Sequence, residues 1–574
     1  MSESETCDAI VIGAGAAGMT AAAVAAAEGL QVLLVEKTSL VGGTTAWSGG
    51  MVWVPANRKM SEIGLADSVA AARLYLHNTV PDPFNLELRE TFLARADEAI
   101  SYLEAHTQLR FMPVKTYPDY YPDLAGATEG GRVLEPCPFD ARALGADFAI
   151  LRPPLPEFTL FGGMMISRRD MPHFRKLGRS ARSTWRAAQL LGRHAWQRLS
   201  HPRGTTLYLG NALAGRLLLS LRARDIALAC ETTAESLLRS EGCIEGAVLR
   251  SKDGTRREIR ARKAVILASG GFSHDRTLRA RYLPTEAGAL SAAAPGNAGD
   301  GIRIGLAAGG RIGAGNANGA FWVPASRFRR GKGAEGVFPH TVTDRAKPGL
   351  IAVGRSGKRF VNEALSYHEF VLAMLRNGNS ATEPAYLICD RRFLWKYGLG
   401  RIRPFTLALR AEIASKYLHT APTPRALAAS LGIDPDRFAA SLETYNRGAR
   451  EGRDEEFGRG GDAYQRHLGD AENRPNPCVA PIERAPFYAV AVYPADLGTA
   501  AGLITDTRAR VLGANGAPIP RLYACGNDMN SIMNGNYPGP GITLGPALTF
   551  AYLAARDAAE GRPGGSAPWT PARA

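Results

Sequence analysis

The sequence predicts an α/β protein in which a Rossmann-like nucleotide-binding domain is split along the chain by an inserted α+β domain. Two observations support this fold class. Residues 8–36 alternate strand, glycine turn, helix and strand, and similar strand-to-glycine-turn segments return at 264–271 and 521–528. A domain that contains both ends of the chain must enclose its partner domain between them. The expected boundaries are 1–316 and 485–574 for the nucleotide-binding domain, with a basic helical insertion at about 153–206, and 317–484 for the catalytic domain.

The first segment, residues 8–36, has the features of a dinucleotide cradle. Residues 9–12 are short, apolar and mostly β-branched, as a buried parallel strand should be. The glycines then follow GxGxxG spacing: the first permits the turn, the second lets a pyrophosphate approach the backbone, and the third lets the helix pack on the strand. An acid ends the next strand, where its carboxylate can hold a ribose hydroxyl. The expected nucleotide-binding residues here are Gly13, Gly15, Ala16, Ala17, Gly18, Glu36 and Lys37.

A second glycine-rich loop follows at 41–50 and indicates which dinucleotide binds. NAD sites need no such loop after the acid, whereas this loop resembles the one with which fumarate-reductase-like flavoproteins bind FAD. Residues 41–60 contain no histidine that could bond to a flavin, so non-covalent FAD is expected. The expected FAD-binding residues in this loop are Gly42, Gly43, Thr44, Thr45, Ser48, Gly49 and Gly50.

Further segments complete the split domain. The alternating segment 244–258 predicts a β-hairpin that leads into the strand at 264–267, and 541–545 opens the last helix, whose N-terminal dipole would face the flavin. No second GxGxxG unit follows a strand, so a substrate is expected to reduce the flavin and an external acceptor to take the electrons. The expected FAD-binding residues of these segments are Ser269, Gly270, Asn297, Asp300, Gly526, Asn527, Thr543 and Leu544.

The composition favours a cytoplasmic enzyme with an anionic partner surface. The net charge is +15, no window approaches ~20 uninterrupted apolar residues, and the seven cysteines are scattered without CxxC spacing. Residues 168–203 hold ten basic residues against the single acid Asp170. Apolar residues recur there at helical spacing, namely Phe174, Leu177, Ala181, Trp185, Ala188, Leu191, Ala195 and Leu199. Such a helix is either a peripheral membrane contact or a helix packed on its own domain, and no recognition motif points to nucleic acid.

Four segments, at 117–121, 362–367, 496–506 and 536–547, carry a more specific resemblance. They resemble the signatures of the 3-ketosteroid Δ1-dehydrogenases, and the resemblance covers nearly the whole chain apart from the insertion. It implies an FAD enzyme that removes one hydrogen from each of C1 and C2 of a 3-ketosteroid and passes the electrons to a quinone-like acceptor. The alternatives are a 3-oxo-5α-steroid Δ4-dehydrogenase, a cyclic-ketone desaturase, an enoate reductase of the fumarate-reductase type, or a flavin-binding protein without turnover.

The resemblance also implies the catalytic residues. The Tyr537 hydroxyl and the Gly541 N–H would donate to the ketone oxygen and stabilise the enolate, as an oxyanion hole does. Tyr367 would take the proton, and because a phenol is a poor base at neutral pH, Tyr120 would stabilise its phenolate by hydrogen bonding. The adjacent Tyr121 stays open as an alternative to Tyr120. His274 and His368 are expected to be structural or surface residues.

Overall fold

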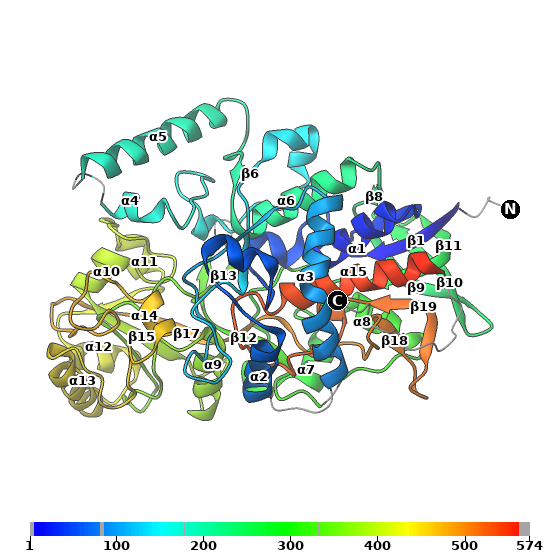
Figure 1. The fold of residues 1–574 in the computed structure, drawn as a ribbon. Coiled ribbons are helices and arrows are strands. Elements are labelled where there is room, and N and C mark those ends of the chain that lie inside the picture. The colour runs from blue at the N-terminus through cyan, green and yellow to red at the C-terminus, as the bar shows by residue number, and fades with distance from the viewer. Residues whose placement is uncertain are drawn as a thin grey trace.

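The computed structural model describes residues 5–80, 85–176, 178, 180–313, 315–330 and 333–561. Its two largest sheets lie side by side, one in the half that contains both ends of the described chain and the other in the opposite half (Figure 1). The mixed α/β class predicted from the sequence is confirmed. Leu177 and Arg179 of the basic segment lie outside the described residues.

The first sheet has eight strands assembled from three distant parts of the chain. Its path is β18 (Arg510–Leu512), β19 (Pro518–Ala524), β11 (Arg256–Leu267), β1 (Glu5–Ile12), β2 (Val32–Val35) and β8 (Ala227–Ala229). The four central pairings are parallel, and the middle strands are buried on both faces. Helices α1 (Ala16–Ala27) and α15 (Leu544–Glu560) pack against each other although they come from opposite ends of the chain (Figure 1).

The predicted hairpin is longer than the sequence suggests. Strand β10 (Cys243–Ser251) pairs with β9 (Thr232–Ser240) on one side and with β11 on the other. The expected second half of the hairpin and the strand at 264–267 form one continuous strand, since β11 pairs first with β10 and then with β1 and β19. The hairpin is therefore joined rigidly to the centre of the sheet.

The second sheet has six strands and forms the core of the other half of the molecule. They are β12 (Ala320–Arg329), β13 (Glu335–Pro339), β14 (Leu350–Val353), β15 (Ala385–Asp390), β16 (His419–Ala421) and β17 (Phe487–Thr499). Strand β17 pairs with β12, β15 and β16, although it follows residue 484, where the sequence suggests a boundary. We propose the second boundary near residue 499 instead, because the sheet continues to that point.

Shorter elements complete the fold. The remaining strands are β3 (Val52–Trp53), β4 (Phe111–Pro113), β5 (Val133–Pro136), β6 (Phe139–Asp140) and β7 (Thr206–Leu207). The remaining helices are α2 (Val69–Thr79), α3 (Leu86–His106), α4 (Met171–Arg175), α5 (Ala181–Arg198), α6 (Leu209–Arg222), α7 (Arg276–Tyr282), α8 (Asp300–Ala307), α9 (Tyr367–Arg376), α10 (Arg391–Tyr397), α11 (Arg410–Ala414), α12 (Pro424–Leu431), α13 (Pro435–Arg450) and α14 (Ala463–Leu468). In the described part of the chain, none of these helices is both long and apolar enough to cross a membrane.

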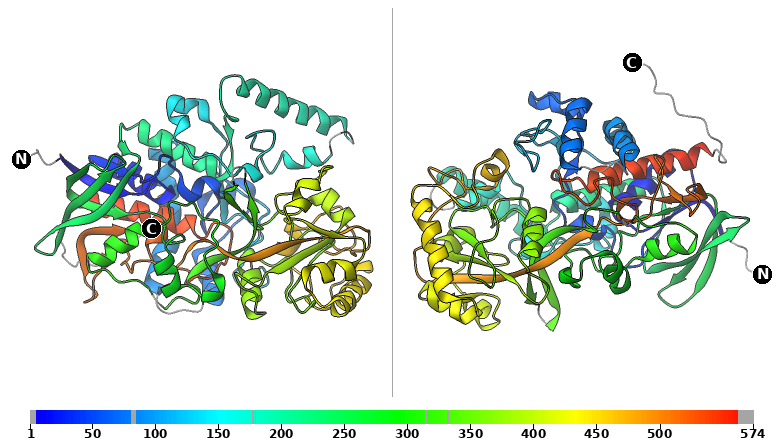
Figure 2. Two further views of the ribbon diagram at one scale, coloured as in Figure 1. Left: turned by 180° about the vertical axis from the view of Figure 1, so that it is seen from behind. Right: turned by 90° about the horizontal axis from the view of Figure 1, so that it is seen from below.

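The basic insertion forms α4 and α5 at the periphery, where α5 lies along the outer edge in both Figure 1 and the left view of Figure 2. The face that α5 buries differs from the apolar face expected from the sequence. Its buried residues are Ser183, Ala187, Leu190, His194 and Gln197. By contrast, Trp185, Trp196 and Leu199 are 68%, 60% and 82% exposed. The helix therefore packs through a narrow, partly polar stripe and leaves its larger apolar side chains outward.

Candidate active site

Three glycines shape the turn between β1 and α1. Gly13 has φ +107°, and a Cβ there would lie 2.3 Å from the Ala268 carbonyl oxygen. A Cβ on Gly18 would lie 1.8 Å from the Gly13 oxygen, so only glycine permits this approach of helix and strand. A Cβ on Gly15, which caps α1, would meet nothing within 4 Å, while one on Gly43 would lie 3.6 Å from the Gly15 Cα. The two glycine loops thus face each other, with open space beside the helix N-terminus, where a pyrophosphate can bind.

Glu36 and Lys37 are fixed where β2 ends. The Glu36 carboxylate accepts from the Ala14 N–H at 3.0 Å and from the Thr38 N–H at 2.9 Å. Lys37 forms an ion pair with Asp300 at the start of α8, so two predicted cofactor residues from distant segments meet. The Glu36 carboxylate is therefore held rigidly where it could accept a hydrogen bond from a ribose hydroxyl.

The second glycine loop is tied to both neighbouring segments. Thr45 Oγ1 accepts from the Ala16 N–H at 3.2 Å, in the first turn of α1. Asn297 donates through Nδ2 to Thr44 Oγ1 at 3.1 Å and to the Gly270 oxygen at 2.9 Å. Among the other predicted residues of the loop, Gly50 must be glycine for packing, because a Cβ there would lie 2.4 Å from the Gly210 nitrogen of α6.

Asp528 is a structural residue of this site that the sequence reasoning missed. It is buried, and it accepts from the Ser269 N–H at 2.5 Å, the Ser269 hydroxyl at 3.0 Å and the Gly271 N–H at 2.8 Å. Burial raises the pKa of its carboxyl group. The carboxyl joins the turn after β19 to the turn after β11, and its signal in the sequence is an acid directly after a glycine turn.

A cavity lies between the C-terminal segment and the second sheet. It is lined by residues of the C-terminal segment, including Gly526, Asn527, Ile542 and Thr543, and by Phe321 of β12. Three of these five residues are among those predicted to bind the cofactor. The cradle and the cavity together have the donors, the carboxylate and the open backbone that FAD requires. The residues present therefore fit this cofactor.

Beside the cavity, the structure brings the three predicted tyrosines together. The hydroxyls of Tyr120 and Tyr367 are 3.3 Å apart. The ring centroid of Tyr537 lies 5.1 Å from that of Tyr367 and 5.6 Å from that of Tyr120. Tyr464 extends the cluster, with its ring centroid 4.6 Å from Tyr120. We call Tyr120, Tyr367, Tyr464 and Tyr537 the tyrosine cluster; all four side chains are buried.

Tyr120 and Tyr537 are positioned by backbone contacts between their loops. The Tyr120 N–H donates to the Pro538 oxygen at 2.9 Å, and the Tyr75 hydroxyl donates to the same oxygen at 2.5 Å. Asp119 accepts from the Trp53 indole N–H at 2.8 Å and pairs with Arg132 at 2.8 Å, with both side chains buried. The loop that holds Tyr120 is therefore held against the Pro-Gly turn that follows Tyr537.

Tyr367 is the first residue of α9, and a buried ion-pair network holds the segment before it. Glu363 accepts from Arg359 at 2.8 Å and from Arg459 at 3.1 Å, and Arg359 also pairs with Asp454 at 2.7 Å. These side chains are almost completely inaccessible, so removing one partner would leave a buried charge unpaired. The Ser366 hydroxyl caps the helix by accepting from the Glu369 N–H.

Gly541 lies in the turn that precedes α15 and has φ +92°, a conformation that favours glycine. A Cβ at this position would lie 2.6 Å from the Met51 oxygen. Its carbonyl accepts from the Trp53 N–H at 3.1 Å and the Gly545 N–H at 2.9 Å. Within the described residues its own N–H has no protein acceptor, so this donor can serve a ligand.

Burial sets the electrostatics of the tyrosine cluster. Desolvation raises the pKa of Tyr367 and Tyr120 well above the ordinary phenol value, and it raises the pKa of Tyr537 to about 12. Hydrogen bonding from Tyr120 lowers the pKa of Tyr367, as the sequence reasoning expected, but burial outweighs it. Tyr367 is therefore a neutral phenol that can accept a proton only if its own proton moves to a neighbour.

Tyr121 and His368 also lie near the cluster. The Tyr121 hydroxyl donates to the Glu369 carboxylate at 2.7 Å and lies outside the cluster, which favours Tyr120 for the role that was left open. His368 is buried with its ring centroid 5.9 Å from that of Tyr537. Its Nδ1 accepts from the Trp322 N–H at 3.2 Å, while Nε2 has no partner among the described residues. Burial lowers the pKa of His368 to about 3, so the imidazole is neutral.

Comparisons with known proteins agree with this geometry. The family model for the FAD binding domain matches residues 8–544. The chain is 37% identical to a 4-oxocyclohex-2-ene-1-carboxylate 5-dehydrogenase from Sinomonas cyclohexanicum, over 96% of this chain and 94% of that protein. It is also 37% identical to a 3-oxosteroid 1-dehydrogenase from Mycolicibacterium smegmatis, over 96% of this chain and 97% of that protein.

A solved structure shares the whole fold. The 3-ketosteroid Δ1-dehydrogenase from Sterolibacterium denitrificans, in complex with 1,4-androstadiene-3,17-dione, has a TM-score of 0.90 to this chain at 36% identity, covering 97% of this chain and 100% of that one. The chain uses FAD and belongs to the FAD binding domain family, in the branch that includes the 3-oxosteroid 1-dehydrogenases.

Proposed function

We propose that this protein is an FAD-dependent dehydrogenase that introduces the C1–C2 double bond into 3-ketosteroids. The observation that carries the proposal is the tyrosine cluster, in which Tyr120 and Tyr367 from different segments meet beside Tyr537. Relatives named for this reaction match over nearly their full length, and the similar solved structure contains a steroid dienone.

The ketone would bind between the Tyr537 hydroxyl and the Gly541 N–H. Both donors lie on the Pro-Gly turn before α15, and the Gly541 N–H has no protein acceptor within the described residues. Donation by both groups stabilises the enolate oxygen more than the ketone oxygen, because charge develops there as the α-proton leaves. The neutral Tyr537 phenol suits this role, since its raised pKa keeps the donating proton in place at neutral pH.

Tyr367 would take the proton from the carbon next to the ketone. Because burial keeps Tyr367 neutral, acceptance of that proton must be coupled to movement of its own proton within the cluster. Tyr120, whose hydroxyl is 3.3 Å away, is the group placed to share this proton. Bound FAD supplies the chemistry of hydride acceptance at its N5 position.

A second candidate function is the desaturation of a simple cyclic ketone. The named substrate of the Sinomonas cyclohexanicum relative is a cyclohexenone carboxylate, and that relative is as similar to this chain as the steroid enzyme is. Both reactions need the same ketone donors and the same base, so the tyrosine cluster serves either substrate. The two substrates differ in the groups attached to the ketone ring.

We further infer peripheral contact with an anionic membrane, a cytoplasmic location and a quinone-like electron acceptor. Trp185, Trp196 and Leu199 project outward from α5, and exposed Arg182 and Arg193 lie on the same helix. Exposed aromatic side chains next to arginines favour the lipid interface, where sterols and quinones partition. The net charge of +15 favours the same partner.

Product identification tests the proposed reaction. The holoenzyme would be incubated with androst-4-ene-3,17-dione and, separately, with a 5α-saturated 3-ketosteroid, each with an artificial acceptor. The expected product of the first is the 1,4-diene, and the expected product of the second is the 1-ene. A 4-ene from the saturated steroid would assign the Δ4 reaction instead, and no product from either steroid would contradict the proposal.

A further inference from the structure

Arg168 of the basic insertion lies next to the site rather than on the outer surface of the molecule. Its guanidinium Cζ is 4.8 Å from the ring centroid of Tyr117, and its Nη2 is 3.5 Å from Met51 Sδ. Both neighbours are buried, and the Arg168 side chain is half-buried. The insertion thus contributes one cation to the inner part of the molecule.

Both neighbours of Arg168 lie close to residues of the proposed catalytic site. The Met51 carbonyl is the group that a Cβ on Gly541 would meet at 2.6 Å. Tyr117 adjoins the tyrosine cluster: burial raises its pKa, and a hydrogen bond with the Tyr120 hydroxyl opposes this shift. Arg168 is therefore separated from Gly541 by Met51, and from Tyr537 by Tyr117 and Tyr120.

Arg168 makes no direct ion pair with an acid. Within the described residues no carboxylate forms an ion pair with it at 4.0 Å or less. The carboxyl group that its charge influences most is Glu135, and burial nevertheless raises the pKa of that group. Burial, together with the charges of Arg168 and Lys347, lowers the pKa of His467 to about 4, and the His467 ring centroid is 4.6 Å from that of Tyr117. Arg168 is therefore a half-buried cation beside Tyr117 with no carboxylate in direct contact among the described residues.

We propose that Arg168 binds a carboxylate of the substrate, so that the preferred substrate is a six-membered cyclic ketone carrying an acid group. The proposal rests on the proposed function and specifies the class of ketone. A guanidinium presents two parallel N–H donors that match the two oxygens of a carboxylate, and the aromatic face of Tyr117 holds its plane in place. A neutral ketosteroid would offer this cation no carboxylate.

Two kinds of substrate carry such a group, and they can be separated experimentally. One is a monocyclic keto acid, and the other is a 3-ketosteroid whose C17 side chain ends in a carboxylate. Each has a methyl ester with the same ring and no charge. The probes are 4-oxocyclohexanecarboxylic acid, 3-oxochol-4-en-24-oic acid, the methyl ester of each, and the neutral androst-4-ene-3,17-dione.

The experiment is steady-state kinetics of the holoenzyme with an artificial acceptor, for the wild type, Arg168→Gln, Arg168→Lys and the control Arg169→Gln. Arg169 is the adjacent, exposed arginine of the same segment. In Arg168→Gln, kcat/KM for the acid should fall by about 10–100-fold, mainly through KM, because a hydrogen bond to a charged group contributes ~1.5–3 kcal/mol. The ester and androstenedione should change by less than about 3-fold. Arg168→Lys should restore part of the loss, since the charge returns without the paired donors.

The proposal would be overturned if acid and ester lost activity equally in Arg168→Gln, since Arg168 would then only pack on Tyr117. It would also be overturned if the wild type did not prefer an acid to its ester. Binding of acid and ester, followed by the change in flavin absorbance, gives a second measurement that does not need turnover. If no ketone is oxidised, the proposed function fails, while tighter binding of the acid that depends on Arg168 would still support the carboxylate site.

Discussion

The hydroxyls of Tyr120 and Tyr367 lie 3.3 Å apart although 247 residues separate them in the chain. Tyr120 comes from a loop packed on the Pro-Gly turn before α15, and Tyr367 begins the helix that packs on β12. The pair thus joins the two halves of the molecule. A change in how the halves approach each other would alter this distance and, with it, proton transfer.

Tyr367→Phe should lower kcat by ~10²–10⁴-fold while leaving ketosteroid binding nearly unchanged, because the substitution removes the proton acceptor and little volume. Flavin reduction in anaerobic stopped-flow measurements tests this directly. Tyr121→Phe is the matched control, since the Tyr121 hydroxyl donates to Glu369 outside the cluster. Turnover near the wild-type value in Tyr367→Phe would remove this residue from the mechanism.

Tyr537→Phe should slow flavin reduction by ~10²–10³-fold, the usual cost of losing one oxyanion donor. Tyr464→Phe provides the comparison, because Tyr464 belongs to the same cluster but its hydroxyl has no protein partner among the described residues. The rate of flavin reduction by a saturating ketosteroid is the measurement. Equal effects of the two substitutions would mean that Tyr537 acts through packing and not through its hydroxyl.

Gly15→Ala should fold but retain little FAD. The new Cβ would meet no protein atom within 4 Å, yet it would enter the space beside the start of α1 where we expect the pyrophosphate to bind. The flavin-to-protein absorbance ratio after purification measures the loss, and Gly192→Ala on α5, also unobstructed, is the control. A purified Gly15→Ala variant with a full complement of FAD would contradict this assignment of the cradle.

Because FAD is non-covalent, the wild type should release its flavin into the supernatant when the protein is precipitated with acid.

The cradle and the tyrosines could be predicted because their signals are local. Glycine spacing fixes the turn at Gly13, and the segments around Tyr120, Tyr367 and Tyr537 resemble family signatures. The relationships that the sequence did not predict depend on packing between distant segments. Asp528 bonds to a turn more than 250 residues away, and β17 joins the second sheet past the expected boundary because its partners are β12 and β15.

The orientation of α5 is another feature that the sequence did not predict, because it too depends on packing. Apolar residues at helical spacing predict the helix, but they do not reveal whether that face meets protein or solvent. In the structure the small residues Ser183 and Ala187 face inward, and the tryptophans face outward. The sequence of the helix alone therefore does not identify which of its faces is buried.

The protein should lose stability as the pH falls below about 6.5. Burial lowers the pKa of His368 to about 3 and that of His467 to about 4, from an unfolded value of 6.5. Between each folded-state pKa and the unfolded value of 6.5, the unfolded chain binds more protons than the folded chain. The free energy of unfolding therefore decreases with falling pH in this range, by up to ~1.4 kcal/mol per pH unit for each histidine.

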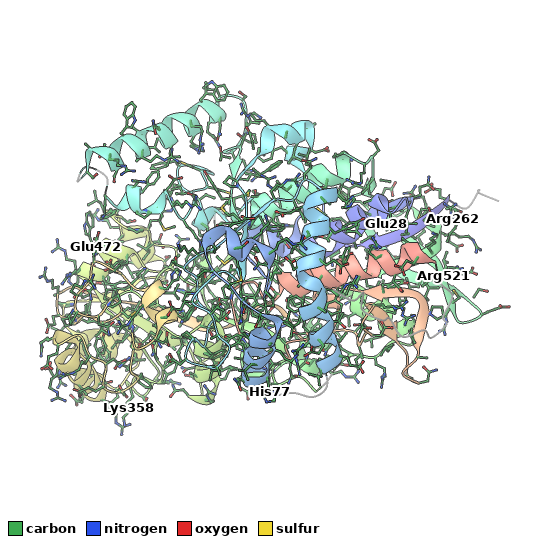
Figure 3. All side chains as sticks on the ribbon, viewed as in Figure 1. Glu28, His77, Arg262, Lys358, Glu472 and Arg521 are labelled. Carbon is green, nitrogen blue, oxygen red and sulfur yellow. The ribbon has the colours of Figure 1, made fainter. Side chains whose placement is uncertain are left out.

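Denaturant unfolding at pH 7.0 and 5.5 measures this dependence. His368→Asn should show a smaller difference between the two pH values than the wild type, because one of the two histidines no longer titrates on unfolding. His77→Asn is the control, since His77 is exposed at the surface (Figure 3). An unchanged pH dependence in His368→Asn would contradict the assignment of a neutral buried imidazole.

Replacing the outward side chains of α5 should release the protein from anionic membranes. Trp185, Trp196 and Leu199 are 68%, 60% and 82% exposed, so changing all three to alanine removes apolar surface without opening the core. Each arginine near an anionic surface contributes about 1 kcal/mol, and the Debye length falls to ~3 Å at 1 M salt, so binding by the wild type should weaken as salt increases. Co-sedimentation with vesicles of phosphatidylserine and phosphatidylcholine at low and high salt is the measurement. Trp395→Ala is the control, because Trp395 is 44% exposed on α10, outside the insertion. If the triple variant sediments as the wild type does, α5 is not the membrane contact.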